Sequence, residues 1–133
     1  MDTIELRLDT SHRAIVDITG DVERFCSGRG DGLCSVFAPH ATAGLALIET
    51  GCGSEEDLLQ AIRTLLPRDD RYRHQHGPVG HGADHVLPAF VPPSLVVPVI
   101  GGRPALGRWQ SIVFVDTNSD NPDRRARLSF LAG

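Results

Sequence analysis

The sequence has few aromatic side chains and only three cysteines. Aromatic residues make up 5% of the chain, with a single tryptophan. Cys26, Cys34 and Cys52 are widely spaced, and no two of them form a C-x-x-C pair. This pattern indicates neither a disulfide framework nor a zinc finger. We therefore expect three reduced thiols in a cytoplasmic protein, each packing as a small apolar group.

The chain also lacks an excess of basic charge and any long apolar run. Its formal net charge is −4, whereas nucleic-acid-binding domains usually carry a clustered basic face. No apolar run approaches the roughly 20 residues of a membrane span, and the first residues lack the basic and apolar parts of a signal peptide. We therefore expect a cytoplasmic protein without a nucleic-acid or membrane partner.

Several catalytic motifs are missing as well. There is no G-x-S-x-G segment and no P-loop, so nothing supports a hydrolase triad or a nucleotide-binding enzyme. The apolar content of 41% and charged content of 23% are ordinary for a globular domain. A chain of 133 residues can bury a real core. We predict one domain over residues 1–133.

Short alternating apolar segments, typical of strands, dominate what is present. Residues 3–10 and 13–19 predict two strands of a hairpin, and residues 33–49 predict a buried strand that bends at Pro39. The other strand-like segments are 94–102, 108–117 and 125–133. Strands follow one another without regular helices between them, which argues against a Rossmann-type sheet. We predict an α+β fold: a mainly antiparallel, jelly-roll-like β-sandwich with one or two packed helices.

Two helices are predicted. A short one opens near Asp21 and closes at Gly28 or Gly30. A longer amphipathic one spans 54–66, with Ser54 as N-cap in a capping box. Residues 68–94 predict a long loop rich in proline and glycine, and such loops are usually functional.

Four of the six histidines lie within twelve residues of that loop: His74, His76, His81 and His85. Imidazole is the commonest protein metal ligand and titrates near neutral pH. The cluster is therefore a metal site, an acid–base site or a polar loop. His81 and His85 share a face only if their segment is helical, and "GHGAD" is a poor helix former. His40 stands apart, as a structural histidine or a ligand at a strand end.

The segments "PHATAGLALIE", "YRH", "GADH" and "GRPALGRWQSIVFVDT", followed by a basic pair, stand in this order. Together they resemble the YjbQ-like family, whose members are often labelled secondary thiamine-phosphate synthases. The resemblance extends from about Ile4 to the C-terminus. It implies a homotrimer. Trp109 belongs to the motif, and as the single tryptophan of a chain with few aromatic residues it is expected to anchor the core or a subunit interface rather than serve as a stacking platform.

The resemblance also implies a metal site formed by His40, His74 and His85. Zinc is the expected ion, and magnesium is possible with a diphosphate substrate. Three imidazoles leave a fourth position open, as in catalytic zinc sites. Glu49 and Asp84 are the acidic candidates for the outer ring nitrogens. The remaining cluster histidines, His76 and His81, are either outer partners or ordinary loop residues.

Phosphate-binding residues follow from the resemblance in the same way. Arg103 and one of Arg124 and Arg125 are the expected pocket arginines, because a guanidinium binds phosphate through two hydrogen bonds. Thr42 either adds a hydroxyl to an anion site or belongs to a β-bulge. Ile48 departs from the family pattern, in which asparagine is common, and such changes leave the substrate open.

Three functions fit these residues. The first is a thiamine-phosphate synthase-like transferase, which joins a pyrimidine diphosphate to a thiazole phosphate and releases pyrophosphate. The second is a metal-dependent hydrolase, with Glu49 as general base. Glu49 and His85 are the candidate catalytic residues. The third is a non-enzymatic trimer that binds a metal or an anion.

Overall fold

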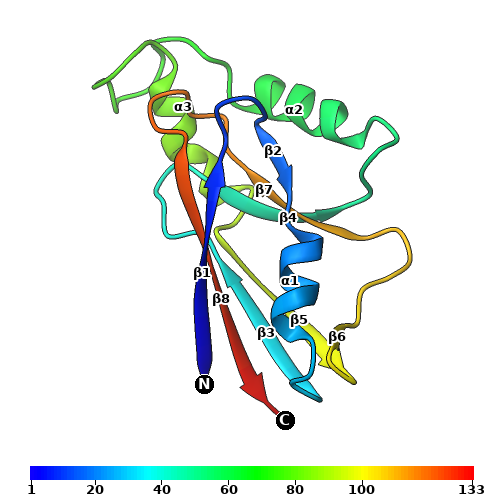
Figure 1. Ribbon diagram of the computed structural model, residues 1–133. Coiled ribbons are helices and arrows are strands. Elements are labelled where there is room, and N and C mark those ends of the chain that lie inside the picture. The colour runs from blue at the N-terminus through cyan, green and yellow to red at the C-terminus, as the bar shows by residue number, and fades with distance from the viewer.

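Two antiparallel β-sheets form the frame of the protein in the computed structural model, which describes residues 1–133 (Figure 1). The larger sheet has the strand order β1-β8-β3-β5-β6, and the smaller has the order β2-β7-β4. The strands are β1 (Asp2–Asp9), β2 (Ile15–Asp17), β3 (Gly32–Phe37), β4 (Gly44–Ile48), β5 (Ser94–Ile100), β6 (Arg103–Pro104), β7 (Ser111–Val115) and β8 (Asp123–Ala132). The predicted α+β fold on antiparallel sheets is confirmed.

The main core lies between the two sheets. Val36 on β3 and Leu128 on β8 face Leu45 on β4 and Phe114 on β7, and all four are buried. Strand β8 shows why the alternation predicts a strand: every second side chain from Arg124 to Phe130 is buried. Side chains that alternate in polarity place one face of a strand on a core.

The predicted hairpin of residues 3–19 is wrong. Strand β1 pairs with β8, with Asp2 opposite Phe130, whereas β2 pairs with β7 in the other sheet. Likewise, β3 and β4 belong to different sheets, so the bend at Pro39 is a crossing between sheets. Alternation reports that a segment is a strand, but the partner of that strand depends on contacts far away in the sequence.

Three helices pack against the sheets: α1 (Thr19–Cys26), α2 (Ser54–Leu65) and α3 (His81–Val86), followed by the 3-10 turn η1 (Leu87–Ala89). The predicted capping box of α2 is wrong, because Ser54 is already helical. Gly53 precedes it with a left-handed φ of 97°, and no side chain caps the helix. Instead, the Gly51 N–H donates to the Glu55 carboxylate at 3.2 Å.

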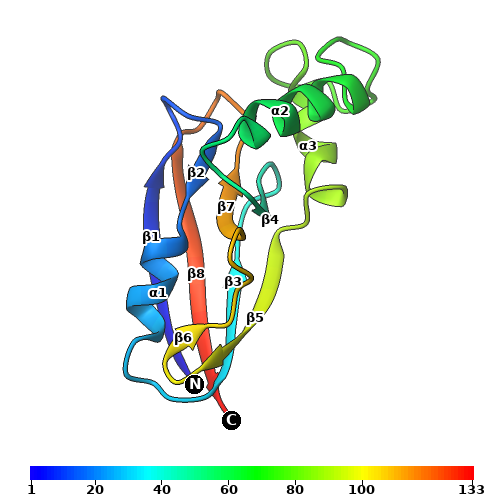
Figure 2. The same ribbon diagram turned by 90° about the vertical axis from the view of Figure 1, so that its right-hand side faces the viewer.

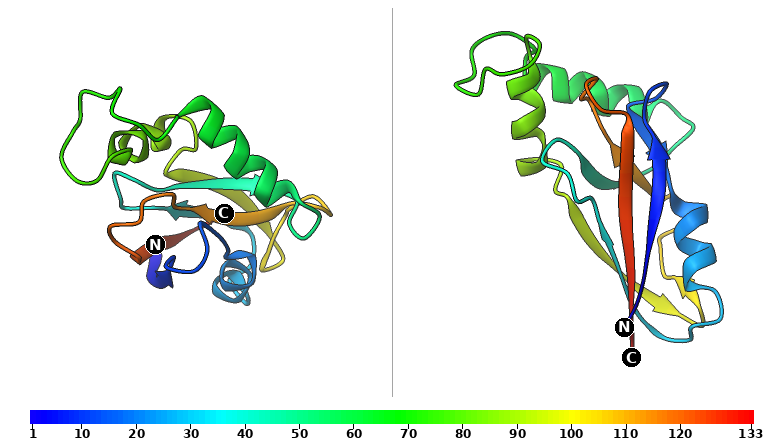
Figure 3. Two further views of the ribbon diagram at one scale, coloured as in Figure 1. Left: turned by 90° about the horizontal axis from the view of Figure 1, so that it is seen from above. Right: turned by 60° about the vertical axis from the view of Figure 1, so that its left-hand side comes forward.

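Helix α3 corrects the prediction that residues 68–94 are a loop. Gly80, with a φ of 89°, precedes the helix, and Ala83 and Leu87 enter a second core cluster with Ile62 of α2 and Val113 of β7. Tertiary packing thus overrides the low helix propensity of the segment. Helices α2 and α3 lie at one end of the molecule, and the segment between them projects outward (Figures 2 and 3). None of the helices has the length and apolar character needed to cross a membrane.

Candidate functional site

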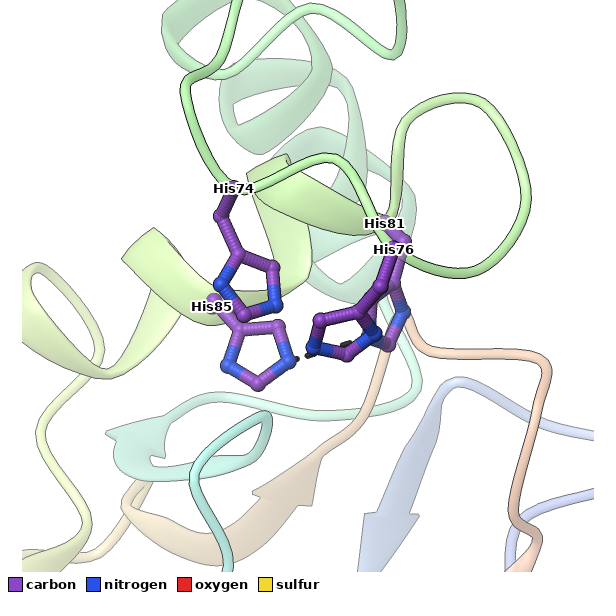
Figure 4. A group of neighbouring side chains, drawn as sticks. All are labelled: His74, His76, His81 and His85. Carbon is purple, nitrogen blue, oxygen red and sulfur yellow. Dashed lines mark hydrogen bonds between the residues drawn. The ribbon is translucent and has the colours of Figure 1, made fainter.

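Four imidazoles converge beside α3 (Figure 4). One ring nitrogen from each of His74, His76, His81 and His85 lies within 4.8 Å of the corresponding atoms of the others. The ring centroids of His74 and His85 are 4.0 Å apart, and those of His81 and His85 are 4.6 Å apart. We call this group the imidazole cluster.

Helix α3 fixes two members of the cluster. His81 and His85 are four residues apart, so they lie on the same face of a helix. Their Nε2 atoms are 2.9 Å apart. As a hydrogen bond, this contact requires one of the two nitrogens to carry the proton. The same approach also suits two unprotonated nitrogens that share an ion.

The second nitrogen of His81 faces acidic side chains. His81 is buried, and its Nδ1 lies 3.1 Å from Oδ2 of Asp120 in the β7–β8 loop. Despite this distance, Nδ1 has no partner in hydrogen-bond geometry. Asp84, also buried, accepts from Arg68 Nη1 at 2.5 Å and from Thr117 Oγ1 at 2.8 Å. Its other oxygen is 3.9 Å from His81 Nδ1.

The surroundings of two members of the cluster, His74 and His85, favour the neutral ring. Burial lowers the pKa of His85, and repulsion by the His74 and His81 rings adds to this effect. Desolvation, followed by repulsion from His76 and His81, also lowers the pKa of His74. Neutral imidazole is the form that binds metal ions. These two rings are therefore neutral, and ready to bind metal, at neutral pH.

The cluster fits a divalent metal ion. Nitrogen donors suit zinc and its late first-row neighbours. Four tetrahedral nitrogens at the usual zinc distance of about 2.0–2.1 Å are about 3.3 Å from one another. The His81 and His85 Nε2 atoms are somewhat closer than this, at 2.9 Å, and no two of the four ring nitrogens are more than 4.8 Å apart. A metal-binding histidine commonly directs its other N–H to a carboxylate, and His81 Nδ1 lies 3.1 Å from Asp120 Oδ2.

Of the predicted metal ligands, the structure places His74 and His85 together but not His40. The Nε2 of His40 accepts the backbone N–H of Arg125 at 2.9 Å, and its ring meets Phe114 edge-on. His76 and His81 join the cluster instead. The spacing of His81 and His85 is the signal for their pairing, but it depends on a helix that composition does not predict.

Thr42 and Arg124, two predicted anion-binding residues, do lie together, but Asp116 already pairs with the guanidinium of Arg124. Arg124 donates to Asp116 from Nε at 2.7 Å and from Nη2 at 3.1 Å, and Nη2 also donates to Thr42 Oγ1 at 2.7 Å. All three residues are buried. We call this group the arginine network. Its carboxylate occupies the guanidinium fork that a phosphate would need.

The other predicted residues lie elsewhere. Arg125 pairs with Glu5 at 3.2 Å on the surface. Arg103 lines a polar cavity of about 590 Å³. Glu49 follows β4 and lies beside Cys52, raising the pKa of that thiol through a hydrogen bond and its charge. Neither Arg103 nor Glu49 is part of the imidazole cluster.

Two antiparallel sheets with four imidazoles at one end define an α+β protein with a candidate metal centre. Residues 3–133 match the family model described as UPF0047 protein YjbQ-like. The chain therefore belongs to the YjbQ-like family.

Relatives and solved structures agree with this assignment. A UPF0047 protein of Mycobacterium tuberculosis is 65% identical over 133 residues and covers all of both chains. A UPF0047 protein of Archaeoglobus fulgidus is 40% identical, over 85% of this chain and 89% of its own. The crystal structure of a hypothetical protein from Aeropyrum pernix has a TM-score of 0.89 at 34% identity, covering 100% of both chains. A YbjQ-like protein of unknown function from Sulfolobus solfataricus has a TM-score of 0.90 at 26% identity, covering 99% of this chain and 97% of its own.

Proposed function

We propose that this protein is a metal-dependent enzyme whose divalent ion, zinc first, is held by the imidazole cluster. The observation that carries the proposal is the approach of four ring nitrogens to within 4.8 Å of one another. Within the cluster only His81 and His85 are within hydrogen-bond distance of each other, so most of these ring nitrogens gain no partner from one another. A shared ion would satisfy several ring nitrogens at once and supply binding free energy to hold them there.

The four ligands have unequal roles. His81 and His85 are held by a helix, whereas His74 and His76 are exposed and lie in the segment before it. We therefore propose that His81 and His85 anchor the ion, and that the side carrying His74 and His76 is open to substrate. A cavity of about 190 Å³, lined by Tyr72, His74 and Gly77 among others, adjoins that side. A bound divalent ion supplies Lewis-acid chemistry for phosphoryl or carbonyl groups.

For the substrate, we propose a small phosphorylated molecule, in keeping with the thiamine-phosphate synthase-like transfer that the resemblance implies. Arg103 supports a phosphate site, since it has no acidic partner and lines a polar cavity. Strand β6, which carries it, lies at the opposite end of the molecule from α3 (Figure 1). A substrate that meets both sites must therefore do so between subunits.

We accordingly propose a homotrimer in the cytoplasm. The exposed apolar side chains of Phe90, Val96, Ile100 and Trp109 support it, because a subunit interface would cover them. Light scattering at micromolar concentration tests the assembly directly. A mass of three chains is expected, and a monomer mass would contradict the trimer.

Elemental analysis and zinc titration test the metal site. The purified protein should carry about one equivalent of metal per chain, and the metal-free protein should take up zinc again. His85→Ala should lose most of this uptake, because it removes an anchoring ring. His12→Ala is the matched control, since His12 is exposed and outside the cluster. Equal zinc uptake by wild type and His85→Ala would rule out the proposed site.

A further inference from the structure

The loop between β7 and β8 reaches the imidazole cluster from outside α3. Asp120 in this loop brings Oδ2 to 3.1 Å from His81 Nδ1. A second contact from the same loop joins Thr117 Oγ1 to Asp84 of α3 at 2.8 Å. His81 is the one cluster member with a carboxylate within ion-pair range of a ring nitrogen. Its Nδ1 is also the one buried side-chain polar atom left without a hydrogen-bond partner.

The contact between Asp120 and His81 affects which ring nitrogen of His81 carries the proton. A neutral ring carries one proton, and only the nitrogen without it can bind a metal ion. His81 Nε2 faces the cluster, 2.9 Å from His85 Nε2, and Nδ1 faces Asp120. An ionised carboxylate accepts hydrogen bonds and cannot donate them. A proton on Nδ1 is therefore favoured by Asp120, and the lone pair is then left on Nε2.

Asp84 cannot take this role as the structure stands. Its nearer oxygen is 3.9 Å from His81 Nδ1, beyond hydrogen-bond distance. Both of its oxygens accept from Arg68, at 2.5 and 3.1 Å, and one accepts from Thr117 as well. Asp84 instead holds α3 against the Arg68 segment and the β7–β8 loop. Neither acidic residue predicted from the sequence for this role, Glu49 or Asp84, therefore lies within hydrogen-bond distance of a ring nitrogen of the cluster.

We propose that Asp120 is a positioning residue for the imidazole cluster: it holds the proton of His81 on Nδ1 and directs the Nε2 lone pair at the ion. This inference rests on the proposed metal site and names the residue that prepares one of its ligands. It also assigns a function to the β7–β8 loop, which would otherwise be an ordinary connection between sheets. Outer partners of this kind typically change metal affinity by about 10–100-fold.

Nitrogen-15 NMR of the metal-free protein shows which ring nitrogen of His81 carries the proton. The wild type should show His81 protonated at Nδ1. Asp120→Ala should shift His81 towards the Nε2-protonated form, because that form is then no longer disfavoured. Asp120→Asn should keep the wild-type tautomer, since its side-chain carbonyl oxygen would take the place of the carboxylate oxygen beside Nδ1. An unchanged tautomer in Asp120→Ala would overturn the positioning role.

Zinc affinity, measured by competition with a chromophoric chelator, is the second readout. Asp120→Ala should bind zinc about 10–100-fold more weakly than wild type, with Asp120→Asn between the two. Ser119→Ala, an exposed neighbour in the same loop, should bind as wild type does. The melting temperature of each metal-free variant separates this effect from misfolding. If Asp120→Ala does not fold, the zinc affinity of Asp120→Asn carries the test: weaker binding than wild type supports the role of Asp120, and equal binding overturns it.

The outcomes separate the two proposals. If the wild type binds no zinc, the metal site itself is refuted. If the wild type binds zinc and Asp120→Ala binds it equally well, the metal site stands and the role of Asp120 is refuted. Equal weakening in Ser119→Ala and Asp120→Ala would assign the effect to the loop backbone and would also overturn the role of Asp120.

Discussion

The arginine network and the imidazole cluster are both groups of polar side chains in the same small protein, but only in the network does every member have a partner. In the network, Asp116 accepts from Arg124, from Thr10 Oγ1 at 2.7 Å and from the Asn118 N–H at 2.9 Å. In the cluster, like rings face one another around a single internal contact, and His81 Nδ1 has no partner. Buried polar groups in folded proteins are normally paired. The network therefore stabilises the fold, whereas the cluster is suited to a ligand.

Arg124→Ala should give the largest effect, because it breaks the arginine network. Removing one partner of a buried ion pair typically costs about 3–5 kcal/mol of unfolding free energy. Urea denaturation measures this loss. Arg125→Ala is the control: its pair with Glu5 is half-exposed, and exposed pairs contribute about 0–1 kcal/mol. Similar losses in the two variants would remove the distinction between the network and the surface.

Zinc binding by Arg124→Ala sharpens the same comparison. If the network serves only the fold, the folded fraction of this variant should bind zinc as tightly as wild type. Chelator competition at low temperature measures that affinity. A drop of tenfold or more would show that the network also supports the cluster, and would join two groups that we treat as separate.

Gly82→Ala should disturb the cluster by a smaller amount. An added Cβ would lie 2.4 Å from Tyr72 Cβ and 2.8 Å from the carbonyl oxygen of His74. The segment that carries His74 must then move, and overpacking of this kind costs about 1–3 kcal/mol. Both stability and zinc affinity should fall. Gly20→Ala is the control, since its Cβ meets only the Arg24 side chain at 3.4 Å, and wild-type zinc affinity in Gly82→Ala would contradict the prediction.

Lowering the pH should reduce the free energy of unfolding of the metal-free protein, and this is the smallest of the expected effects. The pKa values of His74 and His85 are lowered in the folded state, chiefly by desolvation. Above the ordinary histidine pKa of about 6.5 both states are neutral and these rings contribute nothing. As the pH falls below it, the unfolded chain takes up protons first, so stability decreases. Urea midpoints at pH 7.5 and 5.5 measure this loss, which the double variant His74→Gln, His85→Gln should reduce; an equal loss in that variant would assign the effect to other groups.

The strands and the long helix could be predicted from the sequence because their signals are local. The alternation along β8 and the apolar stripe of α2 each report burial of one face of an element. Strand partners could not be predicted, because pairings such as Asp2 with Phe130 join the two ends of the chain. Helix α3 was missed for a related reason: Ala83 and Leu87 are held by packing against α2 and β7, which composition does not report.

The site was predictable only in part. The four histidines of residues 74–85 do gather in the fold, and they include His74 and His85, two of the three metal ligands that the family motif suggested. The motif also suggested His40, whose Nε2 is instead engaged by the Arg125 N–H. Asp120 gave no signal at all, because it lies in a polar loop and meets His81 only after the two sheets have packed. The spacing of residues along the sequence does not predict contacts between segments that meet only in the folded protein.

Strand β8 lies inside the larger sheet, between β1 and β3, although it comes last in chain order (Figures 1 and 2). During synthesis on the ribosome, β1 and β3 are therefore made long before the strand that joins them. Until residues 123–132 emerge, both carry unpaired edges and the buried partner of Asp116 is missing. The larger sheet therefore cannot close until β8 has been made. A chain truncated after Pro122 would keep unpaired strand edges, which are prone to aggregation and are bound by chaperones.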